Sequence, residues 1–367
     1  MNRLLVTIFL ISMAVLNYAH AFKLDPSSKP DSSNLYKKRF FEPIHENLTV
    51  KAVRAANILD SMKNDPVFLS YIVKGVRWND DPLSMAKKRP QDFYIYYRDS
   101  CGRSEEVDPS WDILYRTHCG DMQFLHAMAS KSDESALETK ELMFMWAEFS
   151  YRVAAGDISK DLRFRSVGKK LGKRSSELFN YVMTFDGRFR MEWQPEILFT
   201  LDCKRTLSVN GLLNSGRPTK LKCKDNNNKF SIEGVQNIAL GSLLHLIQDS
   251  FSGSHASREG NVVGVSKISG AGLINQFGIY TSQDEKAHGH ADENIEDECE
   301  HMDLSLTDLS AKLIELAVDQ RSSGSDRWAE AEKLLEKAFA IKTLGKKPGD
   351  IGYGRTIRSS GPAEAGR

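Results

Sequence analysis

Apolar residues recur at helical spacing in five segments of the chain. In the first, residues 48–62, Ala52, Val53 and Ala56 fall on one side of a helix, and four further segments repeat this periodicity: 133–155, 232–249, 303–319 and 325–341. In residues 186–231, short alternating runs such as Glu196–Leu201 stand between turn-forming residues, which predicts a small β-hairpin. Residues 75–125 are rich in Gly, Pro and Asp and are predicted to be mostly loop. The pattern predicts a mainly α fold: a single helical domain with a β-hairpin insertion and long functional loops.

The first 21 residues have the form of a signal peptide. Arg3 supplies the positive charge, residues 4–16 form the apolar core, and Ala19-His20-Ala21 is a cleavage site of the small-x-small kind. The apolar stretch is shorter than the roughly 20 residues that span a bilayer. We therefore expect an exported protein, secreted or periplasmic. The expected divisions of the mature chain are an extended N-terminal arm at 22–39, a helical domain at 40–342 with the β-rich insertion at 186–231, and a disordered tail at 343–367.

The charged residues nearly balance, since 50 Lys and Arg stand against 49 Asp and Glu. This balance does not require a polyanionic partner, although it is compatible with a local basic patch. The five cysteines of an exported chain are expected to form disulfides. Loop-like segments separate Cys203 from Cys223 and Cys101 from Cys119, which favours these two pairs and leaves Cys299 free. Spacing alone leaves other pairings open.

The densest group of potential metal ligands consists of His245, Asp249 and His255. His245 and Asp249 are four residues apart in the apolar segment 232–249, so a helix places both side chains on one face. His255 follows a Ser-Gly-Ser turn that can bring it back to the same point. Imidazole and carboxylate groups that converge in this way are typical of a zinc site. The alternative is a core histidine that hydrogen bonds with a buried aspartate.

Four other segments offer ligands of the same types. They contribute His45, Asp80, His118 and the i,i+4 pair His288 and Asp292. Ligands from so many separate segments favour several metal ions over one structural histidine.

Three of these choices have a neighbouring alternative. Asp81 competes with Asp80, His126 with His118, and His290 with His288. His126 lies in a run of apolar residues that is typical of a helix face packed in the core, so His118 is the preferred ligand. His290 is followed at the fourth position by an asparagine, a poorer ligand than Asp292.

The order of these ligands resembles that of the zinc-dependent phospholipase C and fungal single-strand nuclease superfamily. The matching pattern is His45, Trp78-x-Asp80, His118, His245-x3-Asp249-x5-His255 and His288-x3-Asp292. The likeness covers residues 43–292, and its most specific part is His-x3-Asp-x5-His. It implies a helical domain that holds two to three zinc ions at the bottom of a cleft.

The resemblance also implies which residues bind each ion. Asp80, His118, His245 and Asp249 would bind one zinc ion, His255, His288 and Asp292 a second, and His45, with Asp249 and Asp80 nearby, a third. In the family the mature N-terminal residue completes the third site. Here Phe22 lies far before His45, so the arm folds back, another donor serves, or later processing near Phe40 shortens the chain.

The reaction implied by the resemblance is hydrolysis of a phosphodiester. Zinc lowers the pKa of water, and Asp80 acts as the general base or orients that water. The segment 115–128 is most similar to bacterial phospholipases. The expected function is therefore a secreted, toxin-like phospholipase C that cleaves the glycerol–phosphate ester of phospholipids such as phosphatidylcholine. It would act peripherally at a membrane surface, with no transmembrane span and no obligate protein partner.

Two alternatives remain at the level of sequence. The first is a zinc-dependent single-strand nuclease, which would use the aromatic run 93–97 and the basic stretch 163–174 to bind nucleic acid. The more ordinary interpretation of these two segments is aromatic packing under a loop and a solvated helix face. The second alternative is a secreted protein that binds zinc without catalysis.

Overall fold

The computed structural model describes residues 43–82, 113–172, 174–182, 194–200, 202–205, 221–224, 230–259, 272–280, 305–349 and 351. This part of the chain is mainly helical, which confirms the fold class expected from the apolar periodicity. The predicted signal peptide, the N-terminal arm and most of the predicted tail lie outside the described residues. None of the helices within these ranges has the length and apolar character needed to cross a membrane.

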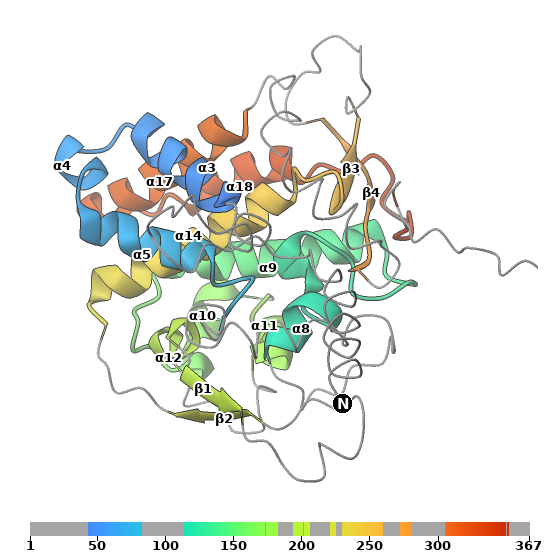
Figure 1. Ribbon diagram of the computed structural model, residues 1–367, viewed down its shortest axis with the longest axis horizontal. Helices are drawn as coiled ribbons and strands as arrows, with labels where there is room; N and C mark the ends of the chain where they lie inside the picture. Colours follow the sequence, from blue (N-terminus) through green and yellow to red (C-terminus); the bar gives the residue numbers. More distant parts are fainter. Residues whose placement is uncertain are drawn as a thin grey trace, which may run out of the picture.

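Helix α14, Ile232–Asp249, is buried along most of its length and has the bounds expected from the sequence. It begins at Ser231, whose side chain accepts a hydrogen bond from the backbone N–H of Gly234 and so satisfies one unpaired helix donor. From Gly234 onward almost every side chain is buried, because other helices surround α14 (Figure 1). These are α3 (Ile44–Ala55), α5 (Pro66–Val76), α9 (Ala136–Ala154), α12 (Pro195–Phe199) and α17 (Leu306–Ser323). Its apolar character on all sides is therefore explained by enclosure.

Helix α5, Pro66–Val76, packs directly against α14 at two glycines. A Cβ atom added to Gly75 would lie 2.1 Å from the carbonyl oxygen of Ile238, and one added to Gly241 would lie 2.1 Å from the carbonyl oxygen of Ile72. The two backbones thus approach more closely than any other residue type allows. The contact sets the distance between α5 and α14 along their shared length.

The two helices run in the same direction. The side chain of Tyr71, in the middle of α5, lies against Gly234 near the start of α14, whereas Asn79, just beyond the end of α5, hydrogen bonds with Ser242 in the second half of α14. The C-terminal ends of both helices therefore point to the same region of the molecule, where the candidate ligands Asp80 and Asp249 lie.

Substitution of Gly241 by alanine is expected to destabilise the fold strongly. The new methyl group would meet the rigid backbone of α5, so the helices must separate, which costs about 3 kcal/mol in the free energy of unfolding. Urea denaturation followed by circular dichroism measures this change. Gly345→Ala is the matched control, because its Cβ meets no atom within 4 Å, and its effect should stay within about 0.5 kcal/mol. Equal stabilities of the two variants would contradict the close packing.

The remaining long helices surround this pair. Helix α9, Ala136–Ala154, begins with a capping box in which Ser135 and Glu138 satisfy each other's backbone N–H groups. Helix α17, Leu306–Ser323, begins at Ser305, whose side chain accepts from the N–H of Asp308. The shorter helices that complete this part are α3 Ile44–Ala55, α4 Asp60–Lys63, α8 Ile113–Cys119, α10 Phe164–Leu171, α11 Arg174–Val182 and α18 Trp328–Ala338.

Two sequence expectations for helices need correction. The helix expected over 48–62 is two helices, because the chain is extended at Ala56 and the backbone N–H of Asn57 bonds with the carboxylate of Glu315. The segment 75–125, expected to be mostly loop, contains α8 and the 3₁₀ helix η1, Gln123–His126. Both are short and held by tertiary contacts, so periodicity does not reveal them.

The β-rich insertion is partly confirmed. Strands β1, Asp202–Arg205, and β2, Leu221–Lys224, pair antiparallel, and Cys203 is directly opposite Cys223 in the register. The run expected as a strand at Glu196–Leu201 is instead helix α12, Pro195–Phe199, which begins with proline at a position that helices favour. Figure 1 places β1 and β2 at the lower edge of the view, far from the second pair of strands.

That second pair consists of β3, Ala256–Arg258, and β4, Ile274–Phe277, which pair antiparallel directly after the candidate ligand His255. The segment 341–349 continues this arrangement: Lys342 donates its backbone N–H to Ile274, and Gly349 donates to Phe277. The disorder expected from residue 343 therefore does not extend to this segment, because its backbone groups are hydrogen bonded.

Candidate metal centre

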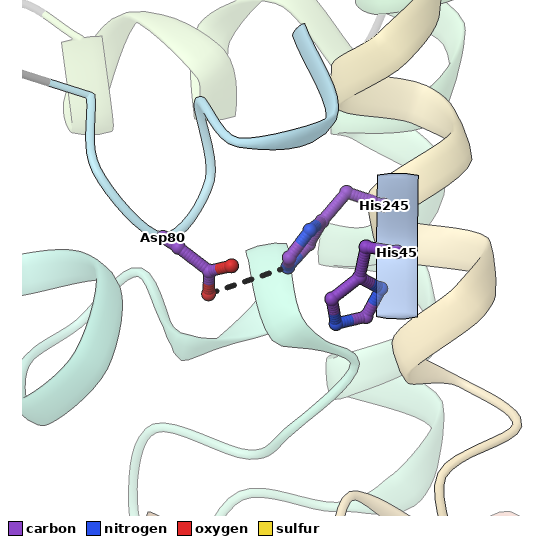
Figure 2. Close-up of side chains that lie close together, drawn as sticks. All are labelled: His45, Asp80 and His245. Atoms are coloured by element: carbon purple, nitrogen blue, oxygen red, sulfur yellow. Dashed lines mark ion pairs between the residues drawn. The ribbon is translucent and has the colours of Figure 1, made fainter. Parts of the chain in front are cut away.

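Seven histidine and aspartate side chains from separate elements converge at the C-terminal ends of α5 and α14. His45 comes from the first turn of α3, Asp80 from the turn after α5, and His245 from the last turn of α14. Figure 2 shows Asp80 pointing toward His245, with His45 beside it. The other four side chains are His118 in α8, His126 at the end of η1, Asp249 at the end of α14 and His255 in the following turn.

Asn79 fixes the turn that carries Asp80. The Asn79 side chain is fully buried; its Nδ2 donates to the carbonyl oxygens of Leu125 (2.9 Å) and Ser242 (3.3 Å), and its Oδ1 accepts from Ser242 Oγ at 2.6 Å. The indole N–H of Trp146 donates in turn to Ser242 Oγ at 3.1 Å. This buried network joins the turn to η1 and α14, so the carboxylate of Asp80 is held in one place relative to both.

Asp249 lies at the centre of the cluster. Its Oδ2 is 2.7 Å from His126 Nδ1, 2.9 Å from His245 Nε2 and 3.5 Å from His255 Nδ1. Its Oδ1 is 3.3 Å from His45 Nε2. A single buried carboxylate thus faces four imidazoles, which come from four different parts of the chain.

Asp80 forms the other acidic side of the cluster. Its Oδ1 is 3.6 Å from His245 Nε2 and 3.8 Å from both His118 Nε2 and His126 Nδ1. Three overlapping groups result, and in each the ligand atoms lie within 4.8 Å of one another: His45, Asp80 and His245; Asp80, His118 and His126; and His126, His245 and Asp249.

The donor set fits a transition metal ion of the zinc type. Two ligand atoms bound to one tetrahedral zinc at about 2.0–2.2 Å are separated by about 3.3–3.5 Å. The separation of 3.2 Å between His126 Nδ1 and His245 Nε2 is close to this value. Within the described residues, the buried Asp249 Oδ1, which faces His45, has no hydrogen-bond partner. Unsatisfied polar atoms at such depth are costly unless a further group binds there.

The tautomers of three histidines are preset by oxygen acceptors. A carbonyl or amide oxygen accepts from Nδ1 in each case: Gln248 Oε1 for His45 at 2.8 Å, the Leu114 carbonyl for His118 at 2.9 Å, and the His126 carbonyl for His255 at 2.6 Å. Because Nδ1 carries the proton, Nε2 is left with a lone pair. Nε2 of His45 faces Asp249, and Nε2 of His118 faces Asp80. An imidazole that is held through Nδ1 and presents Nε2 to the site is the usual arrangement of a metal-binding histidine.

The two aspartates determine which imidazole is protonated in the metal-free protein. Burial alone would lower the pKa of His245, but the carboxylates of Asp249 and Asp80 raise it to about 9. Burial lowers the pKa of His126 to about 4, outweighing its hydrogen bond with Asp249, and it also lowers the pKa of His118. Burial would raise the pKa of Asp80 and of Asp249, yet His245 and its neighbours lower both. The bound proton therefore resides on His245 between two carboxylates.

Zinc binding is expected to tighten as the pH rises. Below pH 9 the imidazole of His245 is protonated and must lose its proton to bind a metal ion, so the affinity should increase about tenfold per pH unit between pH 6 and pH 8. Competition with a chromophoric chelator at constant ionic strength measures this slope. An affinity that does not change with pH over this range would contradict the proton assigned to His245.

The structure places together six of the eight expected ligands. Five of these, His45, Asp80, His118, His245 and Asp249, belong to the three groups of ligand atoms. The sixth, His255, belongs to none of the groups, although its Nδ1 lies 3.5 Å from Asp249 Oδ2. His288 and Asp292, like the alternative His290, lie outside the described residues. Asp81, the alternative to Asp80, belongs to none of the three groups.

His126 was ranked below His118 and yet belongs to two of the three groups. Its side chain is only 2% exposed, so it is a core residue as expected. The ligand cluster itself lies in this part of the core, so a core position does not exclude a ligand. Ala127 follows in the left-handed conformation, with φ at 51°, and this turn directs the His126 carbonyl toward His255. No periodic signal in the sequence distinguishes such a histidine from an ordinary core residue.

The structure describes some of the cysteines that were expected to form disulfides. Cys119 is disulfide-bonded, whereas its expected partner Cys101 and the remaining Cys299 lie outside the described residues. Cys119 follows the candidate ligand His118 directly in the sequence.

Comparison of the chain with protein-family models, with curated proteins and with solved structures found no match.

Proposed function

We propose that this protein is a zinc-dependent phosphodiester hydrolase, and specifically a phospholipase C. The observation that carries the proposal is the buried group of imidazoles around Asp249 and Asp80, with ligand atoms 2.7–3.8 Å apart and the unsatisfied Asp249 Oδ1 among them. Imidazole and carboxylate ligands suit zinc better than magnesium or calcium, which prefer oxygen ligands. Bound zinc supplies Lewis acidity, which polarises phosphoryl oxygens and lowers the pKa of water to about 7.

Asp80 is the residue we assign to the reacting water. Its carboxylate remains ionised at neutral pH, because His245 and the other imidazoles lower its pKa despite burial. A carboxylate with a low pKa is a weak base but a good hydrogen-bond acceptor. We therefore assign Asp80 Oδ1 the task of orienting water for attack on phosphorus, rather than complete removal of its proton.

The basic stretch 163–174, which includes α10 and the first residue of α11, bears on the choice between lipid and nucleic acid. Two cations of the basic stretch 163–174 are engaged in ion pairs: Lys170 with Asp157 at 2.9 Å and Arg174 with Glu148 at 2.9 Å. Cations that are already paired contribute less to binding a polyphosphate strand. Together with the balanced net charge, this favours a zwitterionic phospholipid over single-stranded nucleic acid.

The test combines metal content with two substrates. Protein that lacks the predicted signal peptide is reconstituted with zinc and analysed for bound metal, then incubated with phosphatidylcholine vesicles and, separately, with single-stranded DNA. Two to three zinc ions per chain and release of phosphocholine and diacylglycerol are the expected results. Cleavage of DNA with intact lipid would move the assignment to a nuclease, and zinc without either activity to a binding protein. Less than one zinc ion per chain would overturn the proposal.

A further inference from the structure

The interaction of Gln248 with His45 differs from the other tautomer-setting contacts of the cluster. His118 and His255 donate Nδ1–H to backbone carbonyls, which are fixed by the chain itself. His45 donates to a side-chain amide, Gln248 Oε1, at 2.8 Å. An amide presents an oxygen or an NH₂ group depending on its rotation, so the acceptor for His45 is set by whatever orients Gln248.

Thr49 provides that orientation. Gln248 is fully buried, and its Nε2 donates to Thr49 Oγ1 at 2.9 Å, one turn after His45 on the same helix. In this arrangement the NH₂ group faces Thr49 and the oxygen faces His45. The hydrogen bonds of Gln248 thus join α14 to α3 and determine the tautomer of His45 at the same time.

The tautomer determines whether His45 can belong to the metal centre. With the proton on Nδ1, the lone pair on Nε2 faces Asp249 Oδ1, 3.3 Å away. In the other tautomer Nε2 carries a hydrogen, which can bond with the carboxylate but cannot bind a cation. We propose that Gln248 is a positioning residue that admits His45 to the metal centre by fixing this tautomer. The inference rests on the proposed metal-dependent function.

Three variants test the proposal. Gln248→Met keeps the volume but removes the acceptor, Gln248→Glu keeps the acceptor but loses the donor to Thr49, and Thr49→Val removes only the anchor. We expect Gln248→Met to weaken binding of the zinc ion next to His45 by about 10–100-fold, the range typical of residues that orient ligands. Gln248→Glu should restore it, and Thr49→Val should lie between the two.

Two measurements of these variants are independent of activity. Zinc per chain after dialysis against a weak chelator should fall by one ion in Gln248→Met, and nitrogen NMR of the metal-free protein should show the His45 proton move from Nδ1 to Nε2. An unchanged tautomer in Gln248→Met, or equal zinc retention by Gln248→Met and Gln248→Glu, would overturn the inference. If the unmodified protein binds no zinc, the proposed function fails, and the NMR result still decides the role of Gln248. Thermal melting of all three variants identifies any loss of fold.

Discussion

Asp249→Asn is expected to abolish zinc binding and, with it, any hydrolysis of phosphodiesters. Asp249 Oδ2 lies 2.7 Å from His126 and 2.9 Å from His245, and Oδ1 faces His45 at 3.3 Å. Asparagine has nearly the same shape but carries no charge, and its NH₂ group cannot bind a cation. We expect the loss in affinity to exceed the roughly 10–100-fold that is typical of residues outside the ligand set.

The matched control for this variant is Asp60→Asn. The side chain of Asp60 is 91% exposed and makes a single long contact with Lys63 at 3.7 Å. Both variants lose one carboxylate charge, so effects of net charge cancel in the comparison. Isothermal titration with zinc measures the affinities, and release of phosphocholine measures the activity. If Asp249→Asn binds zinc as tightly as Asp60→Asn does, Asp249 is not a ligand of the metal centre.

His126→Ala is expected to have the second largest effect, and a larger one than His118→Ala. His126 Nδ1 lies 2.7 Å from Asp249, 3.2 Å from His245 and 3.8 Å from Asp80. His118 Nε2 lies 3.8 Å from Asp80. We expect zinc affinity to fall by more than about 100-fold in His126→Ala and by less in His118→Ala.

Both substitutions remove a buried imidazole of the same size, so each serves as the control for the cost of the cavity. Urea denaturation of the metal-free proteins gives that cost, which should be similar for the two variants. Zinc titration then isolates the difference at the metal centre. A larger loss of zinc affinity in His118→Ala than in His126→Ala would instead support His118 as the preferred ligand, as the sequence predicts.

The parts of the fold that the sequence predicts well are those with a strong local signal. Helix α14 has an N-cap at Ser231 and a long apolar run, and its bounds are as expected. The i,i+4 spacing of His245 and Asp249 places Nε2 and Oδ2 2.9 Å apart, as helix geometry requires. Local periodicity therefore accounts for the centre of the site.

The start and the buried face of helix α5 are both marked in the sequence. Pro66 stands at the first helical position, and the buried residues Phe68, Ile72 and Val76 repeat at four-residue spacing. At Pro195, a similar start signal distinguishes helix from strand in a run that is otherwise ambiguous. Short apolar runs are compatible with either structure until a residue at the boundary decides between them.

Other features depend on contacts that no local pattern contains. The position of His126 follows from a 3₁₀ turn and from the left-handed backbone of Ala127, a residue with no preference for that conformation. The orientation of Asp80 follows from Asn79, which is bonded to Ser242 on a helix more than 160 residues away in sequence. Sequence patterns identify the kinds of ligand, and these long-range contacts select among them.

The glycine contact between α5 and α14 has an electrostatic consequence. Because the helices are parallel, the negative ends of two peptide dipoles, each equivalent to about half an elementary charge, face the same cluster of carboxylates. The resulting field favours a cation and repels the anionic group of a phosphodiester. If the protein is the phosphodiester hydrolase proposed above, this field gives an order of assembly in which the cation binds before a phosphate approaches.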